Sequence, residues 1–201
     1  PTKSSAASDV YKRQTDYPVK GISSISDISL MTVQGSGLIG VTGIAGRLFT
    51  VLAQHRVNII LITQASSEHS ITFAVKPADT QRAKNAIEEA FLYEIRSHLI
   101  NEVSIENDLA IVAVIGSGMK NMKGIAGRTF RALGANGVNI RAIAQGSSEL
   151  NISSVISQKD IVKSLNALHE TFFLSDTKSI HLFVVGATGL IGTTLLEQIN
   201  R

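Results

Sequence analysis

The sequence predicts an α+β fold built from two similar modules that follow one another along the chain. Shifting the 201-residue chain by 81 residues aligns residues 33–75 with 114–156 without a gap. Of these 43 aligned positions, 20 carry identical residues, and the run Gly-Ile-Ala-Gly-Arg occurs in both copies. Similarity at a fixed spacing is the signature of duplicated structural units. We therefore expect the two copies to fold in the same way.

Each copy contains the same order of predicted elements. A strand, residues 28–33 in the first copy and 109–115 in the second, ends in Gly-Ser-Gly, where glycine permits positive φ in a tight turn. The Gly-Ile-Ala-Gly-Arg run then begins a helix, because apolar residues follow at helical spacing. Two strands and a second helix come next, and Pro77 precedes that helix in the first copy. With further candidate strands at 19–25 and 102–106, this order predicts two ferredoxin-like βαββαβ modules with both helices on one sheet face.

Composition excludes several classes of function. Apolar residues make up 44% of the chain, enough for a real core. There is no cysteine, which removes disulfides, thiolate metal sites and a cysteine nucleophile, and suits a cytoplasmic location. The formal charge of +3 comes from scattered lysines and arginines, so no nucleic-acid partner is expected, and no stretch is long and apolar enough to predict a membrane partner. The five histidines lack metal-ligand spacing, and with no Walker loop or G-x-S-x-G turn we expect neither a metal site nor a catalytic residue.

The turn between the first strand and the first helix is one half of a predicted ligand site. Backbone N–H groups at a strand exit and helix start are free to bind a small anionic group such as a carboxylate. A simpler interpretation is that Gly43 and Gly46 only allow the helix to pack tightly against the sheet. For one copy alone the simpler interpretation is favoured.

Amide side chains on the following strand are the other half of that site. Asn58 and Gln64 recur as Asn139 and Gln145, whereas Arg141 replaces an isoleucine. Unpaired amides are costly to bury, so their repetition favours a polar recognition site over amides that only bind water at strand ends. Alternation with period two assigns the side chains to two faces. Val57, Ile59 and Leu61 fall on one face, and Asn58, Ile60, Ile62 and Gln64 on the other.

The C-terminal segment carries a different signal. A predicted strand at 179–185 runs into Gly-Ala-Thr-Gly-Leu-Ile-Gly at 186–192 and then a helix start, the context of a dinucleotide-binding Rossmann domain. Gly186, Gly189 and Gly192 are the candidate cofactor-binding residues. Their G-x-x-G-x-x-G spacing differs from the usual G-x-G-x-x-G, and the acidic residue expected about 20 positions on would lie beyond Arg201. NADP or NAD is therefore expected for a longer protein, and neither is expected to bind this chain well.

The tandem repeat resembles the paired ACT modules of aspartokinases. The strand and Gly-Ala-Thr-Gly-Leu-Ile-Gly run that follow resemble the linkage in bifunctional aspartokinase–homoserine dehydrogenases. The matching residues are VKGI at 19–22, the segments 33–59 and 114–140, QGSSELNIS at 145–153 and HLFVVGATGLIG at 181–192.

This resemblance implies interleaved modules, in which the strand at 19–26 joins the sheet of the second module. It also implies feedback regulation by an end-product amino acid, threonine in most bifunctional members with lysine as the other candidate, and a homo-oligomer formed through ACT–ACT pairing. The effector-binding residues that it implies are Gly37, Leu38, Ile39, Gly40, Gly43, Ile44, Asn58, Ile59 and Gln64 in the first copy, and Asn139, Ile140 and Gln145 in the second.

Five segments follow from these observations. We expect a disordered or non-native leader at 1–18, the exchanged strand at 19–26, ACT modules at 27–107 and 108–175, and a truncated Rossmann start at 176–201. The kinase motifs of the family are absent, so aspartate phosphorylation is not assigned to this chain. Two other functions stay open: an NAD(P)-dependent oxidoreductase fragment, and a module that only assembles dimers without a ligand.

Overall fold

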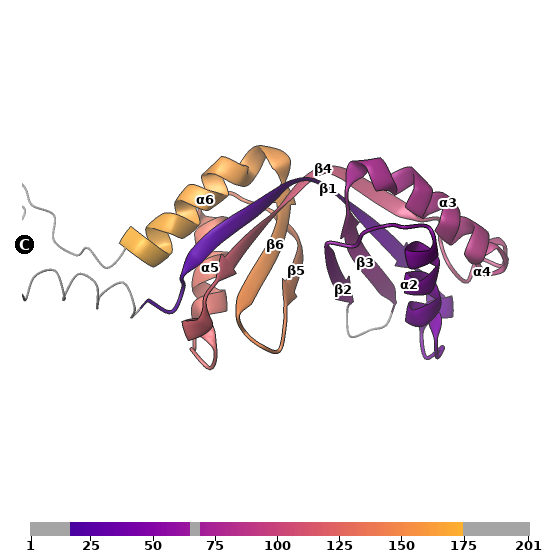
Figure 1. Ribbon diagram of the computed structural model, residues 1–201, viewed down its shortest axis with the longest axis horizontal. Coiled ribbons are helices and arrows are strands. Elements are labelled where there is room, and N and C mark those ends of the chain that lie inside the picture. Colours follow the sequence, from indigo (N-terminus) through magenta and orange to yellow (C-terminus); the bar gives the residue numbers. More distant parts are fainter. Residues whose placement is uncertain (1–16, 65–68, 175–201) are drawn as a thin grey trace, which may run out of the picture.

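The computed structural model describes residues 17–64 and 69–174, which form two α/β modules joined by two long strands (Figure 1). The predicted nucleotide-binding start at 176–201 and all of the predicted leader except Tyr17 and Pro18 lie outside these residues. The first half of the chain forms β1 (Gly21–Gln34), η1 (Ser36–Leu38), α2 (Ile44–Gln54), β2 (Leu61–Gln64), β3 (Ser70–Val75), η2 (Pro77–Asp79), α3 (Thr80–Ala90) and α4 (Leu92–Arg96). The second half forms β4 (Ser104–Ile115), η3 (Ser117–Met119), α5 (Ile125–Ala135), β5 (Ile140–Gln145), β6 (Asn151–Ser157), η4 (Gln158–Asp160), α6 (Ile161–His169) and η5 (Glu170–Leu174).

The two long strands exchange between the modules. The strands of the sheet run in the order β2-β3-β1-β4-β6-β5. Residues 29–34 of β1 pair with β3 in module 1, whereas residues 21–25 pair with 111–115 of β4 in module 2. Conversely, residues 104–106 of β4 pair with 30–32 of β1. Each module therefore completes its four-stranded sheet with half a strand from the other, which confirms the predicted interleaved ferredoxin-like fold.

Both exchanged strands bend at an aspartate. Asp27 and Asp108 occupy equivalent repeat positions and have φ of 53° and 58°, in the left-handed region. The β1–β4 register shifts between Ile25 and Leu30, next to the first of these bends. The separate short strands expected at 19–25, 28–33, 102–106 and 109–115 are thus two continuous bent strands. The predicted boundaries at 27 and 108 coincide with the bends, and they stay predictions.

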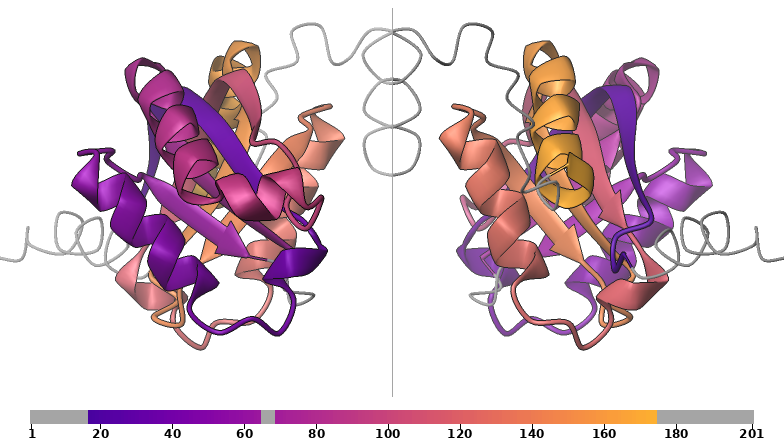
Figure 2. Two further views of the ribbon diagram at one scale, coloured as in Figure 1. Left: turned by 90° about the vertical axis from the view of Figure 1, so that its right-hand side faces the viewer. Right: turned by 90° about the vertical axis from the view of Figure 1, so that its left-hand side faces the viewer.

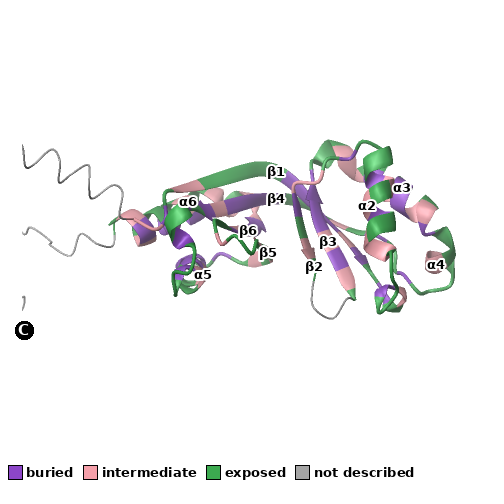
Figure 3. Ribbon diagram, turned by 60° about the horizontal axis from the view of Figure 1, so that its bottom comes forward, coloured by how far each residue is buried: buried purple, intermediate pink, exposed green. Residues whose placement is uncertain are grey.

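The helices lie outside and the sheets face each other. Figure 2 shows the helices of each module in front of its sheet when the molecule is seen from either end. A first core fills the space between the helices and sheet of module 1 around Leu48, Phe73 and Ile87, and a second core around Leu133, Ile152 and Leu168 does so in module 2. The inter-sheet core lies between the two sheets and contains Ile28, Leu30, Leu61, Ala74, Leu109, Ile111 and Val155. The buried stretches of β3 and β4 in Figure 3 mark these cores.

At each Gly-Ser-Gly turn, the backbone segment that precedes an exchanged strand packs directly against the first glycine. A Cβ on Gly116 would lie 2.0 Å from the carbonyl oxygen of Pro18, and a Cβ on Gly35 would lie 2.2 Å from that of Leu99. The expected reason, a positive φ in a tight exit turn, is wrong for Gly116, whose backbone is extended at φ −179°. Glycine is needed there because the segment preceding the exchanged strand passes in direct contact. Two stretches far apart in sequence create this requirement.

Candidate functional site

The Gly-Ile-Ala-Gly-Arg run begins the first helix of each module. Gly43 and Gly124 precede α2 and α5 with φ of 87° and 89°, a conformation that favours glycine. Neither glycine has a side chain, so the first-turn N–H groups of these helices receive no side-chain acceptor from the N-cap residue. A Cβ on Gly46 or Gly127 would meet nothing within 4 Å, so tight packing does not explain those two glycines.

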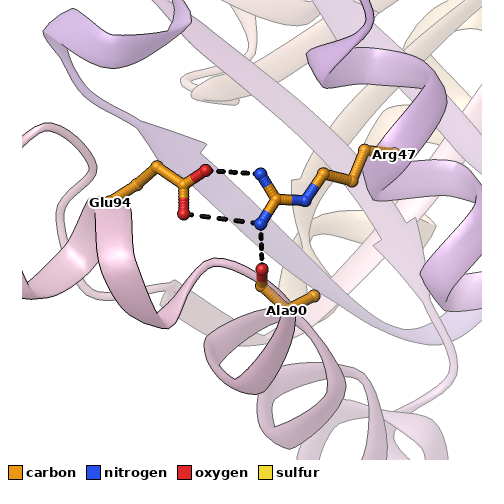
Figure 4. A network of polar contacts seen from close by, with 3 residues as sticks. All are labelled: Arg47, Ala90 and Glu94. Carbon is orange, nitrogen blue, oxygen red and sulfur yellow. Dashed lines mark hydrogen bonds and ion pairs between the residues drawn. The ribbon is translucent and has the colours of Figure 1, made fainter.

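The arginine of the run fixes that helix to the second helix of its module. Arg47 donates hydrogen bonds to Glu94 and to the carbonyl oxygen of Ala90 (Figure 4). Its guanidinium also lies 4.2 Å from the ring centroid of Phe91. The hydrogen bond from Arg47 holds the pKa of the Glu94 carboxyl below its usual value, against the opposing effect of burial. These contacts determine where the α2 helix start lies.

The equivalent arginine of module 2 makes matching contacts. Arg128 donates to the carbonyl oxygen of Thr171 at 2.6 Å and lies 4.9 Å from the ring centroid of Phe172. Thr171 and Phe172 are the repeat equivalents of Ala90 and Phe91. The arginine therefore has a docking role that both modules keep.

A small cavity of about 180 Å³ opens at the α2 helix start. Gly43, Ile44, Ala45 and Gly46 bring the first helical turn to it, and Gln64 brings a carboxamide from the end of β2. Its remaining lining is apolar, from Leu38, Val41 and Ile71. Leu38 and Ile71 are buried, whereas Val41 is 50% exposed and therefore lies at the mouth. The cavity thus combines backbone donors, one amide and apolar walls.

Four of the predicted effector-binding residues line this cavity, namely Leu38, Gly43, Ile44 and Gln64. The other five of the first copy do not line it: Gly37, Ile39, Gly40, Asn58 and Ile59. The N–H of Gly37 donates to the carbonyl oxygen of Leu99 at 2.8 Å, and that of Ile39 donates to Ser36. These two loop N–H groups are engaged within the chain, whereas residues 43–46 of the helix start line the cavity.

The predicted strand faces need one correction. Ile59 packs against the first core, but Leu61, which was expected on the same face, lies in the inter-sheet core on the opposite side of the sheet. The prediction that both share a face is wrong, because β2 begins only at Leu61 and the preceding residues do not follow strand alternation. Asn58 lies six residues before Gln64, at the far end of the segment, so the two amides do not meet at one small cavity.

The same separation occurs in module 2. Ile140 packs against the second core, and Asn139 lines a different cavity of about 310 Å³ with Arg141, Lys159 and Lys163. Gln145 lies at the other end of β5. It meets Gln64 in a cleft of about 500 Å³ between β2 and β5, the two edge strands of the sheet. The structure therefore brings the two repeated glutamines together and leaves both asparagines apart.

Ala45, Gly46 and Ile71 line the α2 cavity but were not among the predicted effector-binding residues. Ile71 is the cross-strand partner of Gln64 in the β2–β3 pair. The register of that predicted hairpin was the signal that could have found it.

Comparison with known proteins places the chain in a family. The sequence model of the ACT domain matches residues 31–91 and 112–172, one match in each module. The chain belongs to the ACT-domain family. It is 39% identical over 183 residues to the bifunctional aspartokinase/homoserine dehydrogenase of Haemophilus influenzae, and 38% identical over 185 residues to the chloroplastic enzyme 1 of Arabidopsis thaliana. These alignments cover 91% and 92% of this chain, which spans about a fifth of the length of these relatives (22% and 20%).

Solved structures of ACT regulatory regions share the fold. The regulatory subunit of aspartate kinase from Thermus flavus matches 77% of this chain and 99% of its own length, with a TM-score of 0.65 and 25% identity. Aspartokinase III from E. coli, solved with lysine and aspartate, matches 78% of this chain and 34% of its own, with a TM-score of 0.60 and 25% identity. This chain is thus a tandem ACT region of the aspartokinase/homoserine dehydrogenase type.

Three further observations complete the search for a site. Gly186, Gly189 and Gly192 lie outside the described residues, so their cofactor role stays a prediction. Over residues 17–64 and 69–174, no set of three or more His, Asp or Glu side chains is grouped to hold a metal ion. Within the same part of the chain, no helix is long and apolar enough to cross a membrane.

Proposed function

We propose that this ACT region is an allosteric sensor that binds a free amino acid, threonine being the favoured effector, in the cavity at the α2 helix start. One observation carries the proposal: first-turn residues 43–46 and the carboxamide of Gln64 line the same cavity of about 180 Å³. A free amino acid has an anionic end and a distinct side chain, and this cavity offers one feature for each.

The α-carboxylate would bind at the helix start. The first N–H groups of an α-helix have no partner within the helix, and the helix dipole favours negative charge there. Gly43 has no side chain to cap them and leaves the approach open. A carboxylate at this position would accept hydrogen bonds from first-turn N–H groups, for which Gly43 supplies no side-chain acceptor.

The lining selects a small, uncharged effector side chain. Leu38, Ile44 and Ile71 give apolar walls, and Gln64 is the one polar side chain among the lining residues. A threonine methyl group suits the walls, and its hydroxyl suits the carboxamide. The ammonium group of a lysine effector would lose water without gaining a carboxylate partner, which is unfavourable. This chemistry favours threonine over lysine.

Regulation would follow from the effector's preference for one arrangement of the ACT modules. A ligand shifts a conformational equilibrium only by its differential affinity for the two states. In a longer cytoplasmic protein with kinase and NADP- or NAD-dependent dehydrogenase domains, binding here would lower activity as end product accumulates. A homo-oligomer would form through the edge strands β2 and β5, which expose Ile62 (47%) and Ile143 (41%).

Calorimetric titration of the chain with threonine, lysine and methionine tests the proposal. Threonine should release or absorb heat and lysine should not. Gln64→Ala should weaken threonine binding by about 1–3 kcal/mol, because its hydrogen bond is lost in a partly desolvated cavity. Gln54→Ala is the matched control, since Gln54 lies at the exposed end of α2 away from the cavity. A folded chain that gives no heat with any amino acid would refute the proposal and leave ligand-free dimer assembly as the function.

A further inference from the structure

Three cationic side chains from three different elements line one cavity of module 2. This basic cavity, of about 310 Å³, is lined by Arg141 from β5, Lys159 from η4 and Lys163 from α6. Asp160 is the single carboxylate among the lining residues, so three positive charges face one negative charge, a formal balance of +2. The cavity at the α2 helix start has no charged lining residue, so the two cavities suit different ligands.

The chain neutralises these three cations unequally. Lys163 forms an ion pair with Asp160 at 3.0 Å. Arg141 contacts Glu106 through Nε, at 2.9 Å from Oε1, and the two terminal amino groups of its guanidinium remain as further donors. In the part of the chain that the structure describes, the Lys159 ammonium has no hydrogen-bond or ion-pair partner. An added anion would therefore find an arginine fork and an ammonium that the chain does not saturate.

The arginine lies at an irregularity of the sheet. The register of the β5–β6 pair shifts at Arg141, and such bulges redirect side chains and are common next to functional sites. The equivalent residue of module 1, Ile60, packs against the inter-sheet core, whereas Arg141 is exposed and lines the basic cavity. Ala78 is the equivalent of Lys159. Two of the three cations are therefore replaced by apolar residues in module 1.

A glycine leaves open space on one side of the basic cavity. Gly137 lines it in the left-handed conformation, at φ 66°, and a Cβ there would meet nothing within 4 Å. The equivalent residue, Arg56, has nearly the same φ of 54° but carries a long side chain. Lys163 donates to the carbonyl oxygen of Gly137 at 3.4 Å, as Arg82 does to that of Arg56 at 3.2 Å. Module 2 thus keeps the local fold and has space beside the Lys163 ammonium.

We propose that the basic cavity of module 2 binds the phosphate group of a small anion through Arg141, Lys159 and Lys163. A planar guanidinium matches two phosphate oxygens at once, and the ammonium groups add attraction as point charges. A phosphate group carries about −1.5 to −2 charges near neutral pH, which balances the lining. A free amino acid is a poor alternative, because its own ammonium group would face three cations.

Titration with inorganic phosphate, followed by backbone amide resonances at constant ionic strength, tests the site. The amides of 137–141 and 157–163 should shift and reach saturation, and sodium chloride alone should not produce these shifts. Arg141→Ile and Lys159→Ala, which introduce the module 1 residues, should each weaken binding about fivefold, since each removes one charge-assisted contact at a partly exposed site. Arg131→Ala removes an equal charge from an exposed position of α5 outside the cavity, and should leave the affinity unchanged.

Shifts that never saturate, that chloride reproduces, or that keep the parent affinity in both cavity variants would overturn the proposal. The two variants are separate proteins, so one that fails to fold leaves the other as the test. A second titration with glycerol phosphate identifies the source of the group. Binding tighter than that of inorganic phosphate assigns the site to a phosphorylated metabolite, and equal or weaker binding assigns it to the free anion. A chain that binds phosphate here but no amino acid would uphold this site and refute the proposed function.

Discussion

Phe73 and Ala83 pack between the sheet and helices of module 1, and Ser154 and Ser164 occupy the equivalent positions of module 2. Both serine hydroxyls are buried without a hydrogen-bond partner in the structure. By contrast, the helix-start glycines, the docking arginines and the edge-strand glutamines are identical in the two modules. The fold thus tolerates change inside a module core, while the glycine and arginine at each helix start and the glutamine on each edge strand are the same in both modules. Substitutions can test each side of this comparison.

The largest expected effect is at the Gly-Ser-Gly turns. Gly116→Ala should lower the free energy of unfolding by about 3 kcal/mol or more, because the new Cβ would lie 2.0 Å from a backbone oxygen that cannot move without shifting the exchanged strand. Gly35→Ala should behave alike in module 1, where the contact is 2.2 Å. Urea unfolding measures both.

Gly127→Ala is the control for these variants. Nothing lies within 4 Å of the added Cβ, and alanine favours a helix over glycine by about 0.5–1 kcal/mol. A loss of stability in Gly127→Ala as large as that in Gly116→Ala would show that the close backbone approach is not what requires glycine.

Removing the docking arginine should give the next largest effect. Arg47→Ala loses the hydrogen bonds to Glu94 and Ala90 and the contact with Phe91, and should cost about 1–2 kcal/mol, since the side chain is 42% exposed and its ion pair is weakened by water. Arg128→Ala should cost a similar amount in module 2. Arg47→Lys should recover only part, because an ammonium cannot make the paired bonds. Unfolding free energies equal to that of the parent would contradict the docking role.

Replacing a buried, unpaired serine of module 2 should increase the stability of the fold. Ser164→Ala should raise the free energy of unfolding by about 1 kcal/mol, because it removes a buried hydroxyl without a partner and reproduces Ala83 of module 1. Ser29→Ala is the opposite control, since the buried Ser29 hydroxyl donates to Asn107 at 2.8 Å. That variant should lose stability. If both changes move thermal unfolding in the same direction, hydrogen-bond satisfaction does not explain the difference between the modules.

The smallest expected effect is a pH dependence confined to module 1. The pKa of Glu94 is lowered in the folded chain, chiefly by the hydrogen bond from Arg47. Its stabilisation is therefore present above the unfolded-state pKa of about 4.3 and is lost as the pH falls through the lower folded-state value. At pH 7 the free energy of unfolding of the parent should be higher than that of Glu94→Gln by less than about 1 kcal/mol. This difference should disappear as the pH falls. A gap that stays constant from pH 7 to pH 3 would exclude this linkage.

Local patterns in the sequence predicted the helices and strands. Contacts between distant segments determine the role of individual glycines and which side chains reach the cavity. The repeat and helical spacing located the helices after Gly43 and Gly124, and repetition singled out Gln64. The purpose of Gly116 depends on Pro18, some hundred residues away, so no local rule could supply it. Likewise, whether Asn58 reaches the cavity depends on where β2 begins, and strand ends are poorly determined by alternation alone.

The effector claim itself is tested most directly by residue-resolved nuclear magnetic resonance during titration with threonine. We predict chemical-shift changes of the backbone amides at 43–46 and of the Gln64 side chain, and loss of these changes in Gln64→Ala. Changes restricted to residues away from the α2 helix start, or none at saturating threonine in a folded chain, would contradict the claim that this cavity binds the effector.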